Sequence, residues 1–111
     1  MLLDAHSAKI PLPIRTTLTG DTIIVASIPN TWIYVHELIG SFPSGPDTLI
    51  VKAGTRVLAE FDLAAGQGIT EQDEPGNEGV PRFSCRPGEA FIIDSVGGTP
   101  FVGAIDYSLR T

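Results

Sequence analysis

The chain has 111 residues, the length of a single domain, and its 12 Gly, 9 Pro and 18% charged residues are typical of short strands joined by turns. Thirteen acidic residues against seven basic ones give a net charge of −6, which argues against binding to nucleic acid or to an anionic membrane. The single cysteine, Cys85, can form no intrachain disulfide, and its place in "RFSCRPG" predicts a buried strand thiol.

The first residues, "MLLDAHSAKIPLP", begin with the apolar side chains of Met1, Leu2 and Leu3. They lack the basic start and long apolar run of a signal peptide, and no stretch of the chain approaches the roughly 20 apolar residues of a membrane helix. We therefore expect synthesis in a cytoplasm. Residues 1–9 are interpreted as an N-terminal arm that grips a neighbouring protein, with folding back onto their own domain as the alternative.

Residues 10–111 are predicted to form one β-sandwich domain, because apolar and polar residues alternate with a period of two along most of this stretch. Strands are expected at residues 10–18, 22–27, 32–40, 48–53, 56–63, 82–85, 90–96 and 101–110. Gly, Pro or Asn separates them, and no segment sustains a helical period. The fold class predicted is all-β, an antiparallel sandwich of about eight strands resembling a jelly roll. The core is expected to include Ile10, Leu12, Ile14, Val57, Phe61, Phe91, Ile93, Ile105 and Tyr107.

Pro11 and Pro13 restrict where the first strand can lie in its sheet. Amide groups two residues apart point to the same side of a strand, so the two prolines remove donors from one side only. The first strand is therefore expected at a sheet edge, and both prolines are candidate interface residues.

The stretch "LAAGQGITEQDEPGNEG" invites two ligand interpretations. Gly66-Gln67-Gly68 could form a phosphate loop, but the acidic and proline-containing segment that follows cannot supply the helix such a loop needs, so a sandwich corner is favoured. The carboxylates of Glu71, Asp73, Glu74 and Glu78 lack the spacing of a calcium loop. We expect them to lie in a solvated, outward-projecting loop.

Catalytic chemistry has few candidates in this sequence. His6 and His36 are far apart, and His36 and Glu37 are expected on opposite faces of a strand, so a metal centre of the kind found in β-barrel enzymes is not predicted. Neither "GxSxG" nor a Cys-His-Asn arrangement appears. We therefore predict no catalytic residue, no cofactor and no metal, and we interpret His36 as a polar residue on a sheet face.

Trp32 and Tyr34 are two residues apart in one predicted strand and should share a face. Large aromatic side chains dominate protein cores and interfaces, which favours one of those locations. A stacking platform for sugars is the alternative, because exposed rings on a β-sandwich can bind carbohydrate.

Three stretches, "TIIVASIPNTWIYVHELIG", "TLIVKAGTRVLAEFDLAAGQGI" and "PGEAFIIDSVGGTPFVGAIDYSLR", resemble small all-β structural proteins of tailed bacteriophages. The resemblance rests on turns and strands: a strand ending in a proline turn, an "I-x-V" strand, a "G-T" hairpin, a "LAAGGG"-like corner and an apolar strand opened by "GEA". It covers about three-quarters of the chain.

The resemblance implies a non-enzymatic virion protein, a capsid decoration or cement subunit that binds the outer surface of the head and stabilises the shell. It implies the major capsid protein as partner and a homotrimer as assembly, with no nucleic acid and no membrane involved. Met1, Leu2, Leu3, Pro11, Pro13, Trp32 and Tyr34 are the candidate interface residues. The alternative function is a carbohydrate- or receptor-binding module on a phage tail or fibre.

Overall fold

The computed structural model describes residues 9–17, 19–73 and 80–111, and these form nine strands in two antiparallel sheets. The strands are β1 (Ile10–Arg15), β2 (Gly20–Val25), β3 (Trp32–Ser41), β4 (Asp47–Ala53), β5 (Arg56–Leu63), β6 (Ile69–Gln72), β7 (Phe83–Cys85), β8 (Phe91–Ser95) and β9 (Val102–Arg110). The described residues contain no helix. The predicted arm, with Met1, Leu2 and Leu3, lies outside them.

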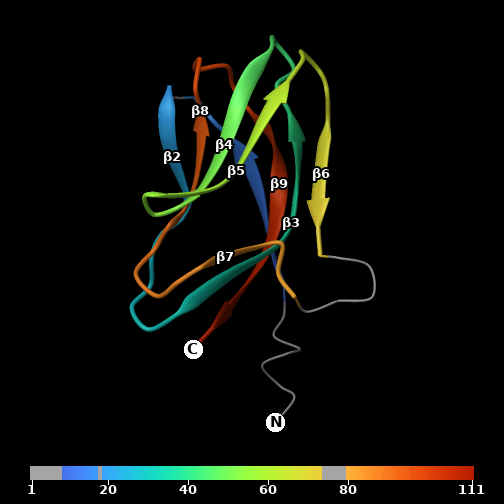
Figure 1. Ribbon diagram of the computed structural model, residues 1–111. Coiled ribbons are helices and arrows are strands. Elements are labelled where there is room, and N and C mark those ends of the chain that lie inside the picture. The colour runs from blue at the N-terminus through green and yellow to red at the C-terminus, as the bar shows by residue number, and fades with distance from the viewer. Residues whose placement is uncertain (1–8, 18, 74–79) are drawn as a thin grey trace.

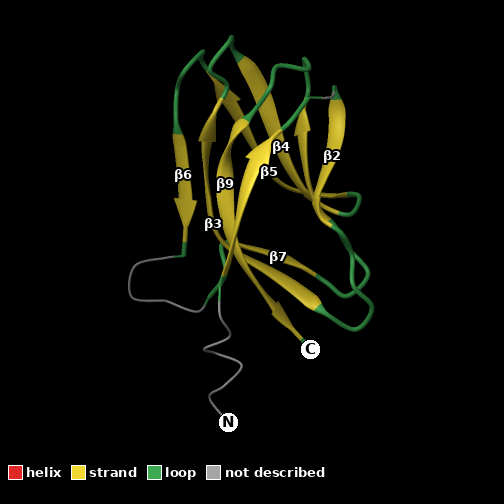
Figure 2. Ribbon diagram, turned by 180° about the vertical axis from the view of Figure 1, so that it is seen from behind, coloured by secondary structure: helices red, strands yellow, loops and turns green. Residues whose placement is uncertain are grey.

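The two sheets have the strand order of a jelly roll. One sheet, here called sheet A, runs β1-β9-β3-β6, with β7 also pairing to β3, and sheet B runs β2-β8-β4-β5. The pairs β4–β5, β3–β6, β2–β8 and β1–β9 are therefore nested as in a long antiparallel ribbon that folds over on itself. Successive pairs lie alternately in sheet B and sheet A, the two layers seen in Figure 1 and Figure 2. The predicted fold class is confirmed.

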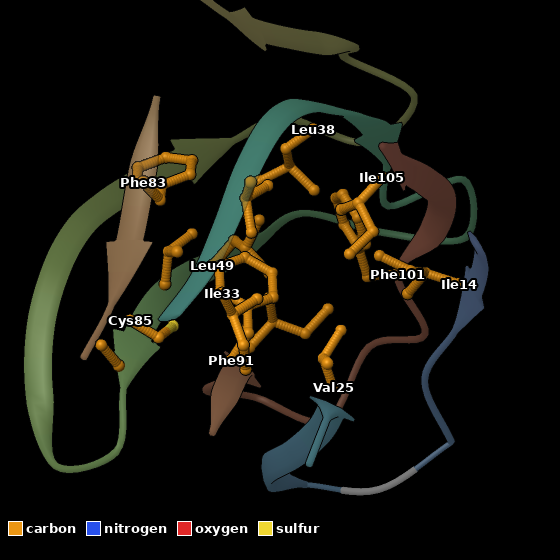
Figure 3. Packing of buried hydrophobic residues seen from close by; sticks show 14 of the residues in the cluster. Ile14, Val25, Ile33, Leu38, Leu49, Phe83, Cys85, Phe91, Phe101 and Ile105 are labelled. Carbon is orange, nitrogen blue, oxygen red and sulfur yellow. The ribbon is translucent and has the colours of Figure 1, made fainter. Parts of the chain in front are cut away.

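The core lies between the two sheets, where side chains from both layers meet (Figure 3). Four of the predicted core residues, Ile14, Phe91, Ile93 and Ile105, are buried there. Three more that were predicted, Leu12, Phe61 and Tyr107, are partly buried and pack against this cluster. The structure adds residues such as Ile33, Val35, Leu38, Phe42, Leu49, Phe83 and Phe101.

Two core predictions are wrong, those for Ile10 and Val57. Ile10 is 39% exposed because it is the first residue of an edge strand. Val57 is 60% exposed because the register of β4 and β5 shifts between Val51 and Lys52. A bulge of this kind moves the residues beyond it to the other face, so simple alternation assigns Val57 to the wrong side.

The location of the first strand agrees with its prolines. Among the described strands β1 lies at the edge of sheet A and pairs with β9 alone, and Pro11 and Pro13 are opposite Asp106 and Ala104. Both prolines are exposed. On the side of an edge strand that points away from the sheet, a proline removes an N–H donor that a further strand could bind. The two prolines therefore protect this edge against the addition of another strand.

The acidic segment after Gly68 differs from the predicted solvated loop. Residues Ile69–Gln72 form β6, a short strand that the alternation analysis missed, and it pairs with β3. Glu71 is partly buried and forms an ion pair of 2.6 Å with Arg82. Glu74 and Glu78 lie outside the described residues.

The turn before β8 is held by a pair of charged side chains. Arg56 donates through Nε and Nη2 to the two carboxylate oxygens of Glu89, at 2.8 and 2.7 Å, and the Arg86 backbone N–H donates to Glu89 Oε1 at 2.8 Å. These bonds, with the one from Arg56 the largest contribution, lower the pKa of Glu89 to about 2. Nearby, burial raises the pKa of the Cys85 thiol to about 12, so this cysteine is a poor nucleophile at neutral pH.

We expect this pair to make stability depend on pH in the acid range. The pKa of Glu89 is lower in the folded chain than its ordinary value of 4.5, so its contribution is complete above pH 4.5 and is lost as the pH falls to about 2. Urea titrations of the wild type and Glu89→Gln should therefore differ most near neutral pH and converge near pH 2. A difference that stays constant between pH 6 and pH 2 would show that the ionised carboxylate contributes nothing.

Candidate functional site

Trp32, Tyr34 and Arg110 form an exposed cluster at one end of sheet A, here called the aromatic cluster. The ring centroids of Trp32 and Tyr34 are 6.0 Å apart, and their planes are tilted by 42°. The guanidinium carbon of Arg110 lies 5.5 Å from the centroid of the Tyr34 ring. This distance is within the range of a cation–π interaction.

The alternation of β3 and β9 places these three side chains together. Ile33 and Val35 are fully buried and point to the core, so Trp32 and Tyr34 point away from it. The register pairs Trp32 with Arg110, and directly paired residues project from the same face of a sheet. The shared face of Trp32 and Tyr34, predicted from their spacing, is confirmed.

The predicted location of the two aromatic side chains needs one correction. Trp32 is 38% exposed and Tyr34 is partly exposed, so neither belongs to the core of this protomer. Of the locations that the sequence left open, an interface or a ligand platform therefore remains. Pro11 and Pro13 lie on the same outer face of sheet A but farther along it, opposite Asp106 and Ala104 of β9. The structure does not bring them next to the aromatic cluster.

A second group of polar side chains, which the sequence pattern does not predict, crosses the outer face of sheet A. His36 Nε2 lies 2.7 Å from Ser108 Oγ on β9, and His36 Nδ1 lies 3.0 Å from Asp73 Oδ2, just past the end of β6. Because a carboxylate only accepts, Nδ1 donates to Asp73, and the Ser108 hydroxyl is the hydrogen-bond partner of Nε2. The three side chains form one hydrogen-bonded chain from β9 across β3 to the residue that follows β6.

A β-bulge brings His36 into this network. The register between β3 and β9 shifts between Val35 and Glu37, so His36 is the extra residue. His36 contacts Ser108 while Glu37 pairs with Asp106, which places both on the outer face, contrary to the opposite faces predicted. His36 is therefore a polar residue on a sheet face, as predicted, and the network leaves only 7% of it exposed.

Asp73 differs from the prediction of a solvated carboxylate. Its side chain is 10% exposed, and its backbone N–H donates to the carbonyl oxygen of His36 at 3.0 Å. Its second oxygen, Oδ1, is buried and receives no hydrogen bond from the described residues. No local pattern in "ITEQDEPG" signals that the carboxylate of Asp73 is buried.

The order Ser–His–Asp is that of a catalytic triad, but the surroundings of Ser108 favour a structural role. A nucleophilic serine presents its oxygen to a substrate beside donors for the developing oxyanion. Ser108 is 3% exposed and lies within a central strand of the sheet. We therefore interpret the network as a tie that joins β9, β3 and the end of β6.

The described residues hold no group of three or more His, Cys, Asp or Glu side chains that could bind a metal ion. They also include no helix long and apolar enough to cross a membrane.

Comparisons with known proteins add little to these observations. No family model matches the chain, and no curated protein matches it. A solved structure of Bacillus endospore appendages, described as a novel family of disulfide-linked pili, is similar with a TM-score of 0.49 and 15% identity. The match covers 92% of this chain and 84% of the other. At this identity the likeness says nothing about what this chain binds.

Proposed function

We propose that this chain is a non-enzymatic virion protein of a tailed bacteriophage, a decoration or cement subunit that binds the outer surface of the head and stabilises the shell. The aromatic cluster is the observation that carries the proposal. Trp, Tyr and Arg are the residue types that contribute most binding energy at protein interfaces, and here all three are gathered outside the core. The major capsid protein is the proposed partner.

Two further points support this proposal. The strands and turns that resemble phage structural proteins fall within the sandwich, and jelly rolls recur among viral capsid domains. The fold by itself is an argument from analogy, since jelly rolls also form lectins. The three-fold assembly that the resemblance implies stays a prediction.

Replacement of Trp32 by alanine tests this function. We expect Trp32→Ala to weaken attachment to isolated phage heads by on the order of thirtyfold, the effect of losing about 2 kcal/mol at an interface hot spot. The urea midpoint should change little, because Trp32 is one of the exposed residues. Co-sedimentation of the labelled protein with heads measures the attachment.

Val57→Ala is the matched control, since Val57 is an exposed apolar residue on the other sheet. It should bind heads as the wild type does. Unchanged binding by Trp32→Ala together with weakened binding by Val57→Ala would place the contact on sheet B and contradict the proposal.

A carbohydrate- or receptor-binding module on a tail or fibre is the second candidate. It is favoured by the side-by-side rings of Trp32 and Tyr34, because sugar rings stack on exposed aromatic faces. A glycan array separates the two candidates. Binding to a glycan that is lost in Trp32→Ala, with no binding to heads, would favour the second.

A further inference from the structure

We propose that the middle of the outer face of sheet A is a contact between two copies of this chain. Nine side chains, here called the central face, form three rows across β1, β9 and β3. The rows are Arg15–Val102–Ser41, Pro13–Ala104–Ile39 and Pro11–Asp106–Glu37. Their inward neighbours Ile14, Leu38 and Ile105 are buried, so these nine point away from the core. This inference does not depend on the proposed function.

The middle row is the apolar part of the central face. It places Pro13, Ala104 and Ile39 side by side, and Ile39 is 38% exposed. An apolar strip of this kind on the surface gains free energy when another surface covers it.

Charge identifies a second copy as the occupant. The chain carries a net charge of −6, so most pairs of its surfaces repel each other. The outer face of sheet B carries one ammonium group, that of Lys52, and four carboxylates. The carboxylates, which belong to Asp21, Glu60, Asp62 and Asp94, give this face an excess of three negative charges. Along β1, β9 and β3 the outer face of sheet A instead has two cations, Arg15 and Arg110, and two anions, Glu37 and Asp106, which cancel.

The charges are also arranged so that the central face complements itself. Arg15 stands in the first row, and Asp106 and Glu37 stand in the third. A two-fold axis along the middle row lays the first row of one copy over the third row of the other, which brings each Arg15 over the Pro11–Asp106 pair of its partner. A two-fold contact requires this reciprocity, and it closes at two copies, in contrast to the three that the resemblance implies.

This arrangement leaves the aromatic cluster outside the contact. Trp32 and Arg110 form a row of their own, beyond the Tyr34–Ser108 row and farther from the axis than the three rows of the central face. Centring the axis on the Asp106 row instead would lay Arg110 over the row of Arg15, with like charges opposed. The dimer therefore presents two copies of the cluster to other partners.

Sedimentation equilibrium tests the contact with variants on the two sheets. The wild type should sediment as a dimer, and Ile39→Asp should weaken dimerisation by on the order of a hundredfold, because it buries a charge at the apolar centre. Ile23→Asp is the matched control on sheet B, where Ile23 is 62% exposed, and it should leave the dimer unchanged. Circular dichroism checks that both variants are folded.

A charge exchange tests the symmetry. Arg15→Asp and Asp106→Arg should each weaken the dimer by about tenfold, and the double variant should restore it, since the pair is only reversed. A wild type that is monomeric or trimeric would overturn the inference. An equal loss in Ile23→Asp and Ile39→Asp, or a double variant weaker than both single ones, would also overturn it. Trp32→Ala should dimerise as the wild type does even though it no longer binds heads. That result would separate the contact between two copies from the proposed attachment to the head.

Discussion

Replacing His36 with alanine is expected to lower the free energy of unfolding by about 2–4 kcal/mol. The change removes both hydrogen bonds of the network, at 2.7 and 3.0 Å, and leaves a gap in a position that is 7% exposed. It also leaves Asp73, with a side chain 10% exposed, without the partner that satisfies Oδ2. A buried polar group that loses its partner costs more than the hydrogen bond itself contributes. Urea unfolding followed by tryptophan fluorescence measures the loss.

Ser108→Ala is the control that separates the two ends of the network. It removes a single hydrogen bond to a neutral hydroxyl, so the expected loss is about 1 kcal/mol. Equal stabilities of His36→Ala and the wild type would contradict the structural role of the network. So would covalent labelling of Ser108 by a fluorophosphonate, because only an activated and accessible serine reacts.

Gly103→Ala is expected to destabilise the fold by about 3 kcal/mol or more, or to prevent folding. Gly103 of β9 is directly opposite Gly40 of β3. A Cβ at position 103 would collide with the carbonyl oxygen of Ile39 and would lie 2.7 Å from the Cα of Gly40. Both atoms belong to the backbone, so relief requires the paired strands to move apart.

Gly45→Ala provides the comparison for this prediction. A Cβ there meets nothing within 4 Å, and the position has no positive φ, so a change of at most about 0.5 kcal/mol is expected. The urea midpoints of the two variants give the measurement. Equal midpoints would show that β3 and β9 have room to separate at Gly103.

The strands that could be predicted are those with a sustained alternation. β9 is long and keeps the apolar side chains of Ile105, Tyr107 and Leu109 at every second position, and β3 does so with Ile33 and Val35 up to its bulge at His36. β6 was missed because its four residues, "ITEQ", include a single apolar side chain and stand in an acidic context. β6 forms because it pairs with β3, a strand that is distant in the sequence. A local sequence pattern cannot predict such a pairing.

The errors at individual residues have the same physical origin. Val57 and His36 both lie at register shifts, and a bulge changes the face of a residue without changing its neighbours in the sequence. The aromatic cluster was partly predictable, because the spacing of Trp32 and Tyr34 fixes a common face. That Arg110 joins them, and that the face is exposed, depends on the pairing of β3 with β9.

The proposed role as a subunit on the outer surface of a phage head is tested most directly by the location of the protein on the particle. Purified virions can be treated with a gold-labelled antibody against the folded domain and imaged by electron microscopy. We predict gold distributed over the outer surface of the heads. Gold confined to tails or fibres, or particles without label, would contradict the account.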